Sequence, residues 1–220
     1  MFSEIWFNMD EDISIINTNT RNEKIKNFFV NNKKNIIFFF TLIVFIFLIF
    51  FGFKEFQNKK KINISNLYNS TIIQHSQDNK KNTKEILIKI INEKDATYSP
   101  LSLYFLLDNR LILNRQEMNN LFDIVIEETS LENEIKNLII YKKALYNADE
   151  VNESELLKIL GPIINSESIW SSHALYLVAE FLYDKNEKIK SKEFYNKILN
   201  TENSNMDLRK EAQKRLNRDL

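Results

Sequence analysis

The stretch that decides the architecture is NNKKNIIFFFTLIVFIFLIFFGFKEFQNKKK, residues 31–61. Its central part, from Ile36 to Phe53, contains 18 residues without a charge, and lysines lie at both ends. As a helix it would span about 27 Å, close to the hydrocarbon thickness of a bilayer, about 30 Å. A core helix of a small soluble domain is seldom apolar on every face. The stretch therefore predicts a transmembrane helix over residues 33–54.

A cleavable signal peptide would also contain an apolar run. This run begins only at Ile36, and it is longer than the apolar region of a signal peptide, about 7–15 residues. It continues into FGFKEFQNKKK, residues 51–61, which offers no cleavage site flanked by small residues. We therefore expect an uncleaved signal-anchor in the cell membrane.

The flanking charges leave the orientation of this anchor open. Five basic residues precede the run and four follow it: Arg21, Lys24, Lys26, Lys33 and Lys34, then Lys54, Lys59, Lys60 and Lys61. A long C-terminal domain can be translocated despite its charges, which favours a cytoplasmic N-terminus. The expected organisation is a short cytoplasmic segment over 1–30, the anchor, a basic linker over 55–61 and a helical domain over 62–220.

The composition excludes several classes of function. Lys and Arg balance Asp and Glu at 30 each, so the basic excess that nucleic-acid binding requires is missing. The chain has no Cys and only two Gly, which excludes thiolate chemistry and Gly-rich phosphate loops. We expect no enzyme, no cofactor or metal and no small-molecule substrate, although a dispersed active site would leave no such pattern.

The scarcity of Gly and Pro favours an all-α chain, because tight-turned β structures need these residues. We expect helices over 62–75 and 82–93 and further helices behind four N-terminal caps. These caps are Ser99 before Pro100, Thr129 with Glu132, Asn152 with Glu155, and Ser204 with Asp207. The third of these helices should stop at Gly161–Pro162. The apolar stripe expected on the fourth is Leu208, Ala212, Leu216 and Leu220.

Paired helices of this length prompt a search for solenoid repeats, and one register is found at residues 172–205. Its first helix carries Leu175, Val178, Ala179 and Leu182, and its second carries Ser191, Tyr195 and Ile198. This spacing resembles the tetratricopeptide pattern, in which small residues let two helices approach closely. Ala179 and Ser191 occupy those close-approach positions. The closing Pro of the pattern is replaced by Asn203, so any amphipathic helical hairpin stays an alternative.

The full layout resembles a family of bacterial membrane-anchored proteins, the ancillary SecYEG translocon subunits of the YfgM type, in their alphaproteobacterial form. The resemblance covers an acidic and then basic leader, MDEDI at 9–13 and RNEKIKNFFVNNKKN at 21–35, followed by the single span. It continues in IWSSHALYLVAEFLYDKNEKIKSKEFYNKILN at 169–200 and MDLRKEAQKRL at 206–216. No segment is a diagnostic signature.

This resemblance implies a fold and a function. The fold would be an α-solenoid of tetratricopeptide-like hairpins behind the single anchor. The protein would lie in the inner membrane with its N-terminus in the cytoplasm and its C-terminal domain in the periplasm. There it would act as a scaffold or adaptor beside the secretion channel and a periplasmic chaperone or foldase.

A protein-binding stripe is predicted on the first helix of the fitted repeat. It consists of His173, Tyr176, Glu180 and Tyr183, which recur every three or four residues and so share one helix face. In tetratricopeptide solenoids this face lines the concave groove, and aromatic rings around a carboxylate would suit a protein segment. The alternative is that these tyrosines pack against a neighbouring helix.

Two other functions compete with the adaptor. The repeats could organise the envelope or the division machinery by holding partners bound to peptidoglycan. A membrane-bound enzyme would require a polar cleft with clustered ionisable groups, and no residue pattern in the chain indicates one.

Overall fold

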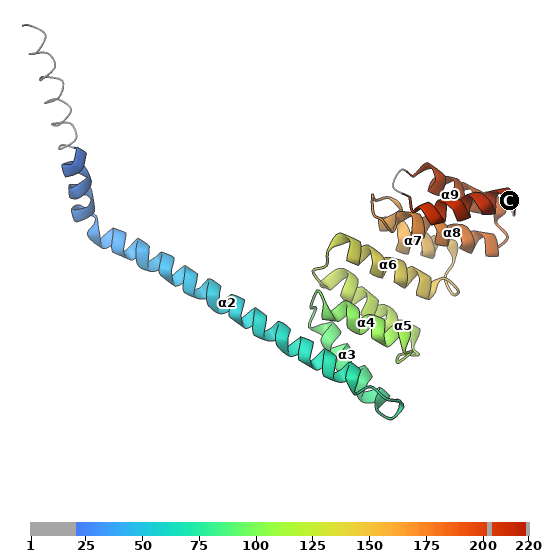
Figure 1. Ribbon diagram of the computed structural model, residues 1–220, viewed down its shortest axis with the longest axis horizontal. Helices are drawn as coiled ribbons and strands as arrows, with labels where there is room; N and C mark the ends of the chain where they lie inside the picture. Colours follow the sequence, from blue (N-terminus) through green and yellow to red (C-terminus); the bar gives the residue numbers. More distant parts are fainter. Residues whose placement is uncertain (1–20, 202–203, 219–220) are drawn as a thin grey trace, which may run out of the picture. The chain divides into compact units, whose positions relative to one another are not determined.

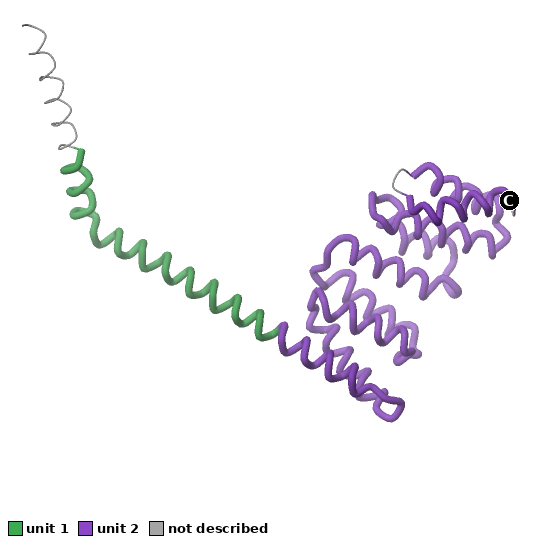
Figure 2. Tube along the Cα trace, in the orientation of Figure 1, with its two compact units in different colours: residues 1–60 green, residues 61–220 purple. Residues whose placement is uncertain are grey.

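The computed structural model describes residues 21–201 and 204–218. Within these ranges all regular structure is helical and no strand occurs, which confirms the all-α class. The chain divides into two compact units, residues 1–60 and 61–220 (Figure 2). The boundary between the units falls next to Ile62, where the helical domain was expected to begin.

The first unit is a membrane-type helix with a bend near its start. Residues 21–31 are helical, Asn32 forms a turn, and α2 runs over Lys33–Ile73 (Figure 1). All side chains from residue 37 to residue 53 are exposed, and an 18-residue stretch of α2 has a mean hydropathy of 3.1. Among the described residues, α2 is the one helix long and apolar enough to cross a membrane. Residues 1–20 of the expected N-terminal segment lie outside the described residues.

The stretch expected as a basic linker, residues 55–61, is helical and forms part of α2. It contains neither Gly nor Pro, and its Lys, Glu and Gln are good helix formers. Lys59 also pairs with Glu55 one turn earlier, with 3.7 Å between the charged atoms. For the same reason the helix expected over 62–75 is not separate: it is the last part of α2.

The second unit is a succession of helices, each of which from α3 on packs against the next one along the chain (Figure 1). After the end of α2 and the short η1 (Gln77–Asn79) they are α3 (Lys80–Asn92), α4 (Tyr98–Asp108), α5 (Arg115–Asp123), the π-helix η2 (Ile124–Glu128), α6 (Asn133–Asn147), α7 (Glu153–Ile164), α8 (Ser171–Asp184), α9 (Lys188–Asn200) and α10 (Met206–Arg218).

One of the four predicted helix caps is confirmed. The Asn152 side chain accepts from the Glu155 amide and the Glu155 side chain from the Asn152 amide, both at 3.0 Å, which is a complete capping box. The stop predicted at Gly161–Pro162 is wrong, because α7 continues to Ile164. Pro162 lies inside the helix, where it has no N–H to donate to the carbonyl four residues earlier, and the helix ends two residues later.

The other three caps are wrong, each because a different residue ends up at the helix start. The Asp95 carboxylate accepts from the Tyr98 amide at 2.8 Å, whereas Ser99 is buried inside α4. Thr129 ends η2, and α6 begins only at Asn133.

At the start of α10, the Asn205 side chain, not Ser204, accepts from the amides of Asp207 and Leu208, at 3.0 and 3.2 Å. On the stripe expected along this helix, Ala212 is buried and Leu208 and Leu216 are half-buried. Leu220 and Asn203 lie outside the described residues.

A single spacing of buried residues recurs in four successive helix pairs of the second unit. In each pair, a buried residue on the first helix is followed by buried residues 12, 16 and 19 positions later. These lie on the second helix, except Val125, which lies on η2 directly after α5. The four sets are Thr71–Thr83–Leu87–Ile90, Leu106–Met118–Phe122–Val125, Ala144–Leu156–Leu160–Ile163 and Ala179–Ser191–Tyr195–Ile198.

The last of these sets lies in the register predicted from the sequence. The Ser191 hydroxyl donates to the Ala179 carbonyl at 2.8 Å, so α8 and α9 approach closely where small residues were expected to let them. Beyond this pair, buried Ala212 on α10 follows Ala179 by 33 positions.

Candidate protein-binding surfaces

The predicted stripe lies on α8 and is half-buried along its whole length. It consists of His173, Tyr176, Glu180 and Tyr183. The helix brings these side chains into one row, as the spacing predicted. Side chains from α6, α9 and α10 contact this row, and they determine how much of it is open to a partner.

Glu180 is the centre of these contacts. Its carboxylate accepts hydrogen bonds from the Tyr195 hydroxyl on α9 and from Arg215 Nη2 on α10, the latter at 2.7 Å. The side chains of Glu180 and Arg215 are only 26% and 23% exposed. The Arg215 guanidinium also lies over the Tyr183 ring, 5.5 Å from its centroid. A ligand at Glu180 would therefore compete with the contacts that join α8, α9 and α10.

The pKa values of the two tyrosines next to Glu180 are raised above the ordinary value of a tyrosine. Burial raises the pKa of Tyr195, and its hydrogen bond to Glu180 raises this pKa further. Burial also raises the pKa of Tyr176, whose ring meets the Tyr195 ring edge-on at 5.8 Å. Tyr176 thus packs against the neighbouring helix α9, which was the alternative to a role in protein binding.

His173, at the start of the stripe, belongs to an aromatic cluster between α6 and α8. Its ring centroid lies 5.1 Å from that of Trp170 and 6.0 Å from that of Tyr141. The Trp170 and Tyr141 rings stack nearly parallel at 6.0 Å. This cluster joins α6 to the first turn of α8.

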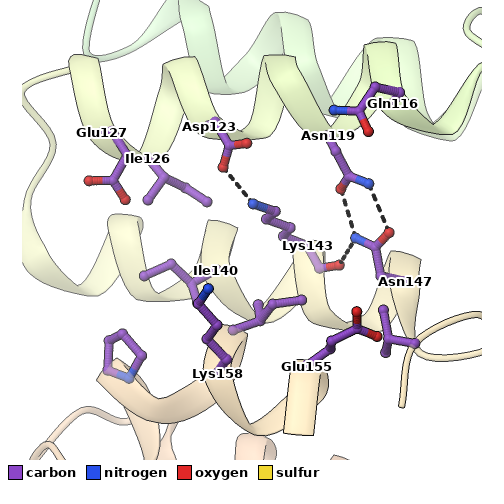
Figure 3. Close-up of a pocket in the computed structure, with 13 residues that line it drawn as sticks. Gln116, Asn119, Asp123, Ile126, Glu127, Ile140, Lys143, Asn147, Glu155 and Lys158 are labelled. Carbon is purple, nitrogen blue, oxygen red and sulfur yellow. Dashed lines mark hydrogen bonds and ion pairs between the residues drawn. The ribbon is translucent and has the colours of Figure 1, made fainter. Parts of the chain in front are cut away.

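A second surface is an open groove over α6, with α5 and η2 on one side and α7 on the other (Figure 3). Its volume of about 730 Å³ lies within the range of ligand sites in proteins, about 300–1,000 Å³. It is lined by Gln116, Asn119, Asp123, Ile126, Glu127, Ile140, Lys143, Asn147, Val151, Glu155, Lys158, Ile159 and Pro162.

Two polar contacts join α5 to α6 inside this groove (Figure 3). The amides of Asn119 and Asn147 exchange two hydrogen bonds, at 2.9 and 2.8 Å. Asn147 also donates to the Lys143 carbonyl at 2.7 Å, and the Lys143 ammonium pairs with Asp123 at 2.5 Å. These contacts fix the side chains of the floor in one arrangement.

The rim of the groove presents both signs of charge. Glu127 and Glu155 are exposed on η2 and α7, and Lys158 is exposed one turn beyond Glu155. Buried Ile126 and Ile140 lie between the polar side chains. Rigid amides, charges of both signs and apolar surface together suit a polypeptide, whose backbone and side chains offer all three kinds of partner. Part of the rim is a π-helix, an element frequent at functional sites.

The histidines and carboxylates of the described residues form no cluster that would bind a metal ion. Within residues 21–201 and 204–218, no three His, Asp or Glu side chains are placed to hold a metal ion. His75 Nδ1 lies 3.2 Å from the hydroxyl of Thr83. Thr83 is 1% exposed, and its hydroxyl also contacts the Asn79 side chain at 3.3 Å.

The groove was missed at the level of sequence because its residues come from four helical segments. The reciprocal pair Asn119 and Asn147 is hidden by the abundance of Asn in this chain, which makes every Asn look like polar filler. One sequence feature could have pointed to Asn147: it follows Ile140 and Ala144 at helical spacing, on the apolar face of α6. In the structure Asn147 is 4% exposed.

Comparison with known proteins identifies no relative of this chain. No family model, no curated protein and no solved structure matches the chain.

Proposed function

We propose that this protein is a membrane-anchored, tetratricopeptide-like scaffold that binds other proteins. The observation that carries the proposal is the spacing of buried residues that recurs in four successive helix pairs. Helical repeats that bury the same positions stack into a solenoid, and solenoids present extended surfaces to protein partners. Under this proposal each helix pair is one unit of the solenoid. α10, which buries Ala212, is its last, capping helix.

The anchor supports the same proposal. The apolar run of α2 is exposed on all sides, so it needs an apolar solvent, and a bilayer provides one. Tethering by α2 would confine a binding surface to the membrane and raise its effective concentration toward partners in the same membrane.

The partners and the compartment follow from the family resemblance of the sequence. The N-terminus would lie in the cytoplasm and the repeats in the periplasm, beside the secretion channel and a periplasmic chaperone or foldase. Of the two surfaces, the groove over α6 is the better candidate for partner contact, because the carboxylate of the α8 stripe already accepts from Tyr195 and Arg215.

Site-specific photocrosslinking in the membrane tests this function. A photoreactive residue replaces Lys158 in the groove, Tyr176 in the stripe, or Lys192, an exposed control on α9. We expect crosslinks to a component of the secretion channel or a periplasmic foldase from position 158 and none from position 192. Capture of the same species from all three positions would contradict a specific surface. Capture of division proteins alone would overturn the secretion role in favour of the envelope organiser.

Topology is tested separately by adding protease to spheroplasts. We expect the second unit to be digested and a fragment containing the apolar run of α2, residues 36–53, to remain protected. Full protection of the second unit would place it in the cytoplasm and defeat the periplasmic role.

A further inference from the structure

An open apolar hollow lies on one face of the first unit, where the helix over residues 21–31 meets α2. Its volume is about 390 Å³, and it is lined by Phe28, Asn32, Asn35, Ile36, Phe39, Phe40 and Ile43. These residues recur at intervals of three and four positions along the chain, so they share one helix face. The side-chain amides of Asn32 and Asn35 lie toward the N-terminal end of this face. Aromatic and branched side chains follow them toward the C-terminal end, as far as Ile43.

The position of the hollow relative to the uncharged run suggests its depth in a bilayer. The run begins at Ile36, which marks the edge of the hydrocarbon. The headgroup layer extends about 5–7 Å beyond that edge, and Asn32 lies about 6 Å further along the helix axis. Asn32 is therefore in the outer part of the headgroup layer, and Asn35 lies at its inner boundary, about 1.5 Å from the hydrocarbon. Phe39 and Ile43 lie about 4.5 and 10.5 Å inside the hydrocarbon, alongside the acyl chains.

The chain around the hollow is strongly basic. Residues 21–34 contain five basic residues and one acid, and all six side chains are exposed: Arg21, Lys24, Lys26, Lys33, Lys34 and Glu23. Each cation near a membrane surface favours an anionic over a neutral lipid by about fivefold. Asn32 uses one N–H to donate to the Phe28 carbonyl at 2.9 Å, and a primary amide has a second.

We propose that this hollow binds one anionic phospholipid. Its phosphate would accept hydrogen bonds from the Asn35 amide and the Lys33 ammonium, and one acyl chain would lie along Phe39, Phe40 and Ile43. The inference rests on the proposed membrane anchoring, because the depth of each residue is measured from the span.

Quenching of a tryptophan in the hollow by brominated lipids tests the proposal. The full-length protein carries Phe39→Trp, with Trp6→Phe and Trp170→Phe to remove the other two tryptophans. It is reconstituted into liposomes in which either phosphatidylglycerol or phosphatidylcholine is brominated. We expect quenching to show a preference for phosphatidylglycerol of about fivefold. The double variant Lys33→Gln, Asn35→Leu should lower this preference to near parity.

A matched control is available at the other end of the span. Lys59→Gln with Asn58→Leu makes the same two changes in residue type outside the hollow, and it should leave the preference at position 39 unchanged. Equal quenching by both lipids in the parent protein would overturn the proposal. An equal loss in both double variants would also overturn it, because net charge would then explain the preference.

Flotation of the liposomes separates this inference from the function on which it rests. If the parent protein does not float with the liposomes, the membrane anchoring itself fails. If it floats but shows no preference for phosphatidylglycerol, only the lipid site is rejected.

Discussion

At the scale of single residues, Glu180 and its two donors join three helices of the second unit. A carboxylate that is mostly removed from water is stabilised by charge-assisted hydrogen bonds, and here these come from Tyr195 and Arg215 on two different helices. The residue chosen from the sequence as a binding group thus also fixes the C-terminal helix. The two roles make different predictions about stability.

Tyr195→Phe removes one of these donors and keeps the buried ring. We expect the free energy of unfolding to fall by about 1.5–3 kcal/mol, as for hydrogen bonds to charged groups. Urea unfolding of the full-length protein in detergent, followed by circular dichroism, measures the loss. Tyr183→Phe, on the same face of α8, is the matched control and should cost little. Equal losses for both variants would show that the hydroxyl of Tyr195 has no special role.

The same variant has a predicted pH dependence. The pKa of Tyr195 is raised in the folded protein, so folding favours its protonated form. Its contribution is complete below the pKa of an unfolded tyrosine, about 10, and is lost as pH rises above that value toward the folded pKa. Between pH 9 and about 11 the parent protein should therefore lose more stability than Tyr195→Phe.

At the scale of helices, the sequence predicts the class of structure better than the ends of its elements. Uniform apolarity and scarce Gly and Pro suffice to predict a helix long and apolar enough to cross a membrane and an all-α unit. Of the four caps, only Asn152 with Glu155 has both partners of a capping box in place. At the start of α4, Asp95 prevails over Ser99 because Ser99 instead donates to the buried carbonyl of Ile90 at 3.1 Å. That preference depends on tertiary packing, which no local pattern contains.

From the sequence, the recurrent burial pattern could be recognised in only one of the four helix pairs, because burial also depends on tertiary packing. Its close-approach position holds Thr71, Leu106, Ala144 and Ala179 in the successive pairs. Only the last two are small and apolar, and Leu106 reverses the expected size. What the pairs share is burial, which becomes apparent only when neighbouring helices are in place.

Ala179→Leu tests the close approach of α8 and α9. The Ser191 hydroxyl reaches the Ala179 carbonyl at 2.8 Å, so a larger side chain there would separate the helices. We expect a loss of about 1–3 kcal/mol, the usual cost of overpacking, measured by the same urea unfolding. Ala148→Leu, at the half-buried end of α6, is the control and should cost less. A neutral Ala179→Leu would argue against a close-approach position.

At the scale of the whole molecule, α2 takes part in both units: it carries the exposed apolar run and ends in the helical unit. The last part of α2 contributes buried Ile64 and Thr71 to that unit, and Tyr98 donates to the Ser65 hydroxyl at 2.6 Å. The apolar run and residues 55–73 thus belong to one continuous helix.

This reading predicts how charges in the run affect membrane integration. Phe45→Lys with Leu48→Lys places two cations near the middle of the span, where each costs about 2.5–3.5 kcal/mol for insertion. We expect the variant to appear in the soluble or carbonate-extracted fraction, whereas the parent protein stays in the membrane pellet. Gln57→Lys with Asn58→Lys adds the same charge beyond the run and should leave the protein in the pellet. Retention of Phe45→Lys, Leu48→Lys in the pellet would mean that residues 36–53 are not the anchor. The helix would then have to bury its apolar surface against protein, as a second copy of the chain could provide.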